Sequence, residues 1–277
     1  MILNTLMNNP KLTFYDLGHG VKAFSTTRHG GCSTGNYGEL NVNAYCGDSA
    51  EAVAANRKSL CATLGIEPSH LVVPHQVHRV ESRLIAPELF SLPLSVQDKL
   101  LDGVDAVMTQ MSGVCIGVST ADCIPVLLYD EVHRACAAVH AGWRGTLNHV
   151  VLKTVREMAI SFSSKPQDLR AIIGPGISVD HFEVGQEVYD QFAQLNFDMH
   201  SMARQYPAER HSPSEPPLKW HLDLKWANRA DLRFAGLADE HIADCGICTY
   251  EQVADYFSAR RLGTASGRIY TGIMMTD

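Results

Sequence analysis

The chain has 277 residues, of which 45% are hydrophobic and 19% charged, and its formal net charge is −7. This composition excludes a chain that is disordered throughout, because it supplies ample apolar material for a core. The net negative charge argues against a protein that binds nucleic acid or an anionic membrane surface.

Short apolar runs alternate with helical periodicities along the chain. They predict strands at residues 21–26, 71–74, 114–119, 124–129, 135–139, 169–173 and 268–274, and helices at 48–64, 146–162, 185–195 and 224–235. Segment 87–101 is predicted to be a surface insertion, and segment 202–220, which is rich in proline, a mobile loop. Neither segment divides the chain, so the sequence predicts one α/β domain, residues 1–277, with a mixed sheet.

The eight cysteines follow no repeating framework. Residues 1–18 lack the basic and then apolar order of an export signal, and no uninterrupted apolar stretch of about eighteen residues could span a bilayer. We therefore expect a reduced, cytoplasmic protein.

Potential metal ligands stand at the ends of predicted strands. Cys123 and His140 lie at consecutive strand ends, and His75 and His78 follow the strand at 71–74. One Cys and two His would form a His₂Cys site, whose open fourth position is typical of catalytic zinc. The spacing leaves open whether His75 or His78 is the ligand, since strand residues three apart face opposite sides. It also leaves open that Cys123 and His140 are only packing residues.

Two charged residues accompany these candidates. Asp122 is a carboxylate between apolar strands, where it would either act in the chemistry or cap a turn. Arg144 stands in a Gly-Trp-Arg-Gly segment that suits an anion at a helix start, or it pairs with Asp122.

Three weaker motifs remain. Cys245-Gly-Ile-Cys248 lacks the second pair of a structural zinc site. His181-Phe-Glu183 matches half of the zinc deaminase signature, but the Pro-Cys-x-x-Cys half is missing. Gly267-Arg268, like Arg260-Arg261, is either solvated charge or an anion-binding edge.

A series of motifs in fixed order resembles the multicopper-polyphenol-oxidase-like, or laccase-domain, family. The motifs are TTRHGG-STG-YGELN (26–41), HQVH (75–78), DAVMTQ (105–110), TADCIPVLLYD (120–130), AAVHAGWRGT (137–146), IGPGI (173–177), FEVGQEV (182–188), CTYEQVADYFSARR (248–261) and GR (267–268). The resemblance covers nearly the whole chain from about residue 20.

The resemblance implies a single-domain, mixed β-sheet sandwich flanked by helices. It implies a zinc-dependent purine nucleoside phosphorylase, acting on adenosine, inosine and methylthioadenosine with phosphate, that also has adenosine deaminase activity. The family's metal ligands correspond to His78, Cys123 and His140, for zinc or alternatively copper. Two departures, Gly176 where the family often has Cys and Ala259 where it often has Tyr, bear on substrate fit.

On chemical grounds we expect Asp122 to carry the proton to ammonia in deamination and Arg144 to bind phosphate in phosphorolysis. The expected rim of the pocket contains Arg28, Asn41, Arg260 and Arg261. The expected partners are purine nucleosides and phosphate, with neither nucleic acid nor membrane, and the protein would be a monomer or weak homodimer.

Three other functions use the same residues. A polyphenol oxidase would need a trinuclear copper cluster, and the sequence contains no His-x-His pair. A metal-free hydrolase would use Cys123 as nucleophile and His140 as its base. A binding protein with a structural metal would need a fourth ligand, which the sequence does not obviously supply.

Overall fold

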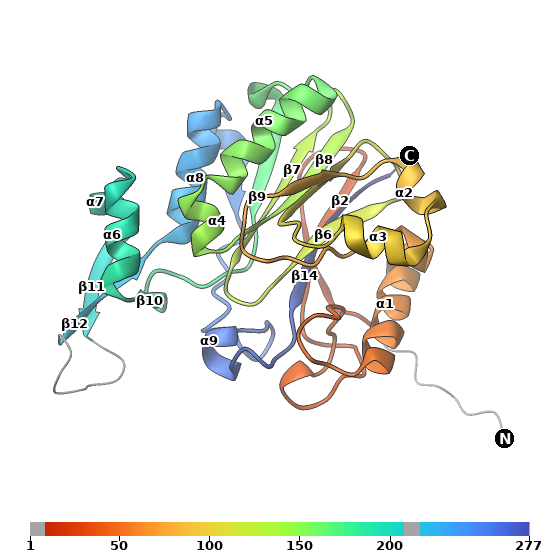
Figure 1. The fold of residues 1–277 in the computed structure, drawn as a ribbon, viewed down its shortest axis with the longest axis horizontal. Coiled ribbons are helices and arrows are strands. Elements are labelled where there is room, and N and C mark those ends of the chain that lie inside the picture. Colours follow the sequence, from red (N-terminus) through yellow and green to blue (C-terminus); the bar gives the residue numbers. More distant parts are fainter. Residues whose placement is uncertain (1–8, 208–216, 277) are drawn as a thin grey trace.

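Two β-sheets packed face to face form the centre of the computed structural model, which describes residues 9–207 and 217–276 (Figure 1). The first sheet consists, in spatial order, of β1 (Leu12–Tyr15), β2 (Val21–Thr26), β14 (Ile269–Met275), β6 (Cys115–Thr120) and β3 (Leu71–Val72). The second consists of β13 (Ile242–Asp244), β9 (Leu169–Ile173), β7 (Ile124–Asp130), β8 (Ala135–Ala141), β5 (Ala106–Thr109) and β4 (Ser82–Leu84). Both sheets mix parallel and antiparallel pairs, which confirms the predicted α/β class and the sandwich that the family resemblance implied.

Helices pack over the outer faces of the sandwich, along its edges and beside it (Figure 1). They are α1 (Ala50–Leu64), α2 (Pro87–Ser91), α3 (Leu94–Leu100), α4 (Trp143–Leu147), α5 (Val150–Phe162), α6 (Gln186–Gln194), α7 (Met199–Met202), α8 (Leu224–Ala235) and α9 (Ala259–Leu262). Val118 of β6 packs with Leu127 of β7 between the sheets, whereas Val126 of β7 faces Met158 of α5. Leu60 of α1 packs on the far side of the first sheet. The central strands are apolar on both faces because both faces are covered.

The predicted helix at 146–162 is wrong as a single element, because α4 ends at Leu147 and α5 begins at Val150. His149, between them, has a left-handed backbone with φ of 57°. Its imidazole Nδ1 lies 2.8 Å from the Asp231 carboxylate of α8, and its ring stacks on Phe197. These tertiary contacts stabilise the break between α4 and α5, which the helical periodicity of the sequence does not reveal.

Segment 202–220 is not a loop throughout. Its described parts contain β11 (Ala203–Pro207) and contribute to β12 (Leu218–Leu222). In a small third sheet β12 lies in the middle and pairs with β11 on one side and with β10 (Glu183–Val184) on the other. Trp220 anchors this sheet by stacking on Tyr189 of α6 at 4.0 Å between ring centroids. The centre of the predicted mobile loop, 208–216, lies outside the described residues.

The predicted insertion at 87–101 forms α2 and α3. Leu89 and Leu101 from this segment are buried against the cluster between the sheets. Within the described residues, every helix is too short or too polar to cross a membrane.

Candidate metal centre

The side chains of His78, Cys123 and His140 meet at one end of the sandwich. Cys123 lies where the chain passes from β6 in the first sheet to β7 in the second, and His140 lies in β8. One potential ligand atom from each residue lies within 4.8 Å of the other two. The imidazole rings of His78 and His140 meet edge to face at 4.8 Å. The predicted ligand set is therefore brought together in space.

The segment around His78 explains why strand periodicity could not choose between His75 and His78. His75 forms an isolated parallel bridge with Asp102, and residues 76–78 are irregular rather than part of a strand, with a left-handed backbone at His78 (φ of 62°). The assumption that the two rings face opposite sides is therefore wrong, since both residues line the same cavity. Only His78 contributes to the three-residue cluster.

Asp105, which the sequence analysis missed, holds the two histidine segments together. Its buried carboxylate accepts hydrogen bonds from the Nδ1–H of His140 at 2.8 Å and from the backbone N–H groups of His78 at 3.0 Å and Arg79 at 2.7 Å. With Nδ1 engaged, the Nε2 of His140 is left for the cluster. The DAVMTQ motif contains Asp105, but its position beside both histidines is visible only in three dimensions.

The side chains of the cluster shift one another's pKa values. Burial alone would raise the pKa of the Cys123 thiol, but the charge and hydrogen bonds of His140 and His78 outweigh it and lower the pKa to about 6. Burial alone would lower the pKa of His140, but the Cys123 thiolate and Asp105 raise it to about 9. In the metal-free protein Cys123 and His140 therefore form a thiolate–imidazolium pair at neutral pH.

A cavity of about 260 Å³ opens beside the cluster. Its walls consist of Asn43, Tyr45, Cys46, His75, Gln76, His78, Ser119, Thr120, Ala121, Cys123, His140, Ala259, Thr264 and Arg268. On one wall the His75 ring stacks on Tyr45 at 4.2 Å, and its Nδ1 lies 2.6 Å from the Asp102 carboxylate. Ala259, one of the two family departures, also lines the cavity, so its small side chain affects the shape of the cavity.

Asp122 and Arg144 do not lie among the described wall residues of this cavity. Asp122 occupies the crossover turn with φ of 85°, and its carboxylate accepts hydrogen bonds from the Thr249 hydroxyl at 2.7 Å and the Arg260 backbone N–H at 2.6 Å. Arg144 is exposed, and its guanidinium stacks on Trp143 at 4.1 Å. Neither side chain therefore contributes to the wall of this cavity.

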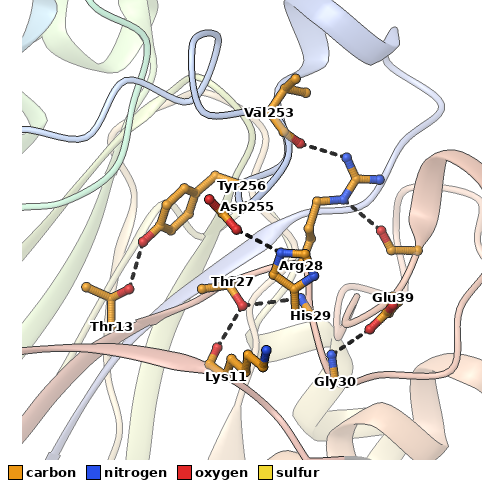
Figure 2. A network of polar contacts seen from close by, with 11 residues as sticks. Lys11, Thr13, Thr27, Arg28, His29, Gly30, Glu39, Val253, Asp255 and Tyr256 are labelled. Atoms are coloured by element: carbon orange, nitrogen blue, oxygen red, sulfur yellow. Dashed lines mark hydrogen bonds and ion pairs between the residues drawn. The ribbon is translucent and has the colours of Figure 1, made fainter.

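Arg28 and Asn41 connect loops rather than lining the cavity. The Arg28 side chain donates hydrogen bonds to the carbonyl oxygens of Gly38 and Val253, each at 2.8 Å (Figure 2). Its guanidinium also lies over the Phe257 ring. Asn41 is fully buried, and its amide oxygen accepts the backbone N–H of Arg268 at 3.1 Å. Both residues thereby support the surroundings of the cavity.

Of the three arginines near the C-terminal end of the motif series, Arg268 is the one on the cavity wall. Its guanidinium also donates hydrogen bonds to backbone carbonyls of its own loop, including Thr264 at 3.0 Å. Arg260 and Arg261 are exposed; the first donates to the carbonyls of His181 and Glu183, and the second stacks on Tyr250 at 4.6 Å. Arg268, unlike Arg260 and Arg261, therefore lies where a ligand in the cavity could reach it.

Comparison with known proteins places this arrangement in context. A family profile described as multi-copper polyphenol oxidoreductase laccase matches residues 22–276. A Bacteroides thetaiotaomicron protein named purine nucleoside phosphorylase is 42% identical over 255 residues, covering 92% of each chain. A protein named adenosine deaminase RL5, from an unknown prokaryotic organism, is 38% identical and covers 95% of this chain and 97% of its own. A crystal structure of a Bacillus licheniformis hypothetical protein named YfiH superposes with a TM-score of 0.84 at 26% identity, covering 97% of this chain and 98% of that one.

Proposed function

The chain belongs to the multi-copper polyphenol oxidoreductase laccase family, and on that basis we propose that it is a purine nucleoside phosphorylase that also deaminates adenosine. The observation that carries the proposal is the His78, Cys123 and His140 cluster opening into a cavity of small-molecule size. The proposed substrates are adenosine, inosine and methylthioadenosine, with inorganic phosphate as the nucleophile in phosphorolysis.

His78, Cys123 and His140 would hold the metal. Two imidazole nitrogens and one thiolate suit zinc and also accept copper. A bound zinc ion supplies Lewis acidity next to the cavity. This cluster supplies only two histidines, fewer than a trinuclear copper centre needs, so the proposal is zinc rather than multicopper chemistry.

The cavity walls suggest how a nucleoside and phosphate bind. The stacked rings of Tyr45 and His75 offer an aromatic face for a purine. Arg268 is the cationic side chain on the wall and would bind the phosphate. We therefore assign to Arg268 the role expected of Arg144.

His75 is the proton-transfer group that the geometry favours. The Asp102 carboxylate at its Nδ1 favours a proton on that nitrogen, which leaves Nε2 to exchange a proton with the substrate. In phosphorolysis a phosphate oxygen attacks C1′ as the bond to the purine breaks, and His75 in its imidazolium form would give its Nε2 proton to the departing base and become neutral. In deamination neutral His75 would take a proton from the water that adds at C6 onto Nε2, and would return that proton to the departing amino group, which leaves as ammonia.

Asp122 would then be a positioning residue. Its carboxylate ties the crossover turn that carries Cys123 to Thr249 and to the start of α9. Both oxygens have a donor, so a proton-carrying role would break these contacts.

A chromatographic assay tests the proposal. Metal-loaded protein would be incubated with adenosine, inosine or methylthioadenosine, with and without phosphate, beside the Cys123→Ser and His78→Ala variants. We expect phosphate-dependent release of adenine or hypoxanthine, and inosine from adenosine without phosphate, both lost in the variants. Survival of all nucleosides in the presence of stoichiometric zinc would overturn the proposal.

The thiolate–imidazolium pair supports a second candidate, a metal-free thiol hydrolase. Asp105 orients His140 as the third member of a Cys-His-Asp triad would. In that case iodoacetamide would alkylate Cys123 equally with and without zinc. Protection by zinc that a chelator reverses would exclude this candidate.

We also propose a cytoplasmic monomer or weak homodimer. All eight cysteines are free thiols in the structure, as suits a reducing compartment. Size-exclusion chromatography with light scattering, at several protein concentrations, measures the oligomeric state.

A further inference from the structure

Two sequence motifs that the Cys123 site does not use come together elsewhere in the fold. His181 begins the His-x-Glu motif in the loop between β9 and β10, and Cys248 ends the Cys-x-x-Cys motif after β13. Gly176 and Cys248 form a parallel bridge, with the Thr249 N–H donating to the Gly176 carbonyl at 3.2 Å. This backbone pairing holds the two loops side by side.

The pairing places three different ligand atoms in one cluster. A ring nitrogen of His181, the Sγ of Cys248 and a carboxylate oxygen of Glu251 lie within 4.8 Å of one another. His181 Nε2 and the Glu251 oxygen are 3.0 Å apart. Zinc–ligand bonds of roughly 2.0–2.3 Å put tetrahedral ligands about 3.5 Å apart, so a slight opening of the His181–Glu251 pair and a small approach of the more distant atoms would enclose an ion.

The surroundings of Cys248 and His181 suit metal binding. Cys248 is 4% exposed, and its sulfur accepts a hydrogen bond from the Ser178 N–H at 3.4 Å, which fixes the position of the sulfur. The Ser178 hydroxyl oxygen is buried and has no hydrogen-bond partner within the described part of the chain. The His181 ring is held by stacking on Tyr250 at 4.4 Å. The cluster is therefore partly ordered before any ion binds.

The charge and solvent exposure of the cluster indicate which kind of metal ion it would bind. One thiolate and one carboxylate neutralise a divalent ion, and the mixed sulfur, nitrogen and oxygen set selects zinc-class metals over magnesium or calcium. Glu251 is exposed, so the site opens to solvent and leaves a position for water. Arg260 and Arg261 stand beside the cluster, and their positive charge would make its affinity lower than that of the Cys123 site.

We propose that His181, Cys248 and Glu251 bind a second divalent transition metal of the zinc class, separate from the ion at His78, Cys123 and His140. The ion would join the loop after β9 to the loop after β13. Thr249, next to Cys248, holds Asp122 at the crossover turn. The second ion would therefore stabilise the crossover turn that carries Cys123, without itself being part of the first site.

Cobalt titration of the metal-free full chain tests the second site without relying on catalysis. Thiolate-to-cobalt absorption reports each site, because each contains one cysteine, and dialysis with metal analysis gives the stoichiometry. We expect two Co²⁺ per chain for the wild type, one for Cys123→Ser and one for His181→Gln. Cys245→Ser is the matched control, since Cys245 belongs to the same Cys-x-x-Cys motif but not to the cluster, and it should retain two.

The outcomes separate the second site from the proposed catalytic site. The second site would be overturned if the Cys123→Ser protein bound no Co²⁺. It would also be overturned if the wild-type and His181→Gln proteins bound the same number of Co²⁺ ions. Either result would leave the proposal for the first site unaffected. The His181→Gln change is at a partly exposed loop residue, so near-ultraviolet circular dichroism should show an unchanged fold. Cys123→Ser/His181→Gln protein that still binds one Co²⁺ would place the second ion elsewhere and also contradict the proposal.

Discussion

Asp105 and His140 are joined twice. The Asp105 backbone carbonyl accepts the backbone N–H of His140 at 2.8 Å, and the Asp105 carboxylate accepts the ring Nδ1–H of the same residue at 2.8 Å. The strand pairing of β5 with β8 thus fixes both the main chain and the ring of His140. The same carboxylate also accepts the backbone N–H of His78 in its left-handed conformation.

Asp105→Asn should weaken metal binding without removing a ligand. The amide cannot accept all the hydrogen bonds that the carboxylate accepts, and it provides no charge to stabilise His140 as an oriented ligand. We expect zinc affinity to fall by about 10- to 100-fold, measured by competition with a chromogenic chelator. Asp102→Asn, at the His75 pair, is the control and should leave zinc affinity within about twofold. Equal losses in both variants would contradict the orienting role of Asp105.

Gly142→Ala should disturb the cluster through a single methyl group. Its backbone φ of −69° is one that alanine adopts, so the backbone itself is not strained. A Cβ there would lie 2.9 Å from His78 Cδ2 and 3.1 Å from Cys123 Sγ, and His78 would have to move. We expect kcat/KM for inosine phosphorolysis to fall on the order of 100-fold, with a melting temperature within a few degrees of the wild type. Unchanged kcat/KM would show that the cluster tolerates displacement.

The strands of the sandwich core could be predicted from the sequence because they are continuous apolar runs. The predicted strands at 114–119, 124–129 and 135–139 correspond closely to β6, β7 and β8. The helix break at His149 could not be predicted, because it depends on contacts with Asp231 and Phe197, which are distant in the sequence. Short strands such as β10 were missed because two residues carry no periodicity.

Motifs in the sequence identify the candidate ligands, but they do not identify the residues that hold those ligands in place. Asp122 and Arg144 looked reactive because they neighbour Cys123 and His140 in sequence, yet neither lies among the described cavity walls. Adjacent residues on a turn or strand point in different directions, so sequence proximity does not give access to a cavity. Asp105 and Tyr45 act through contacts that only the fold creates.

The reactivity of Cys123 in metal-free protein should depend on pH in an unusual range. Because the histidines lower the pKa of this thiol to about 6, the thiolate is the main form at pH 7 and is lost as the pH falls below 6. Iodoacetamide labelling of the Cys123 peptide, followed by mass spectrometry, should have its midpoint near pH 6. His140→Gln should move the midpoint upward. A wild-type midpoint near the ordinary thiol value of about 8.5 would contradict the ion pair.

Arg268→Gln and Arg144→Gln distinguish the two candidates for the phosphate ligand. Arg268 lies on the cavity wall, so loss of its charge-assisted hydrogen bonds should raise the KM for phosphate by about 10- to 100-fold, with a smaller effect on the KM for inosine. Arg144 stacks on Trp143 at the surface, and its variant should change the KM for phosphate by less than about twofold. Thermal melts of both proteins control for the loop contacts that Arg268 makes with backbone carbonyls. The reverse pattern would return the phosphate to Arg144 and would require α4 to turn toward the cavity when substrate binds.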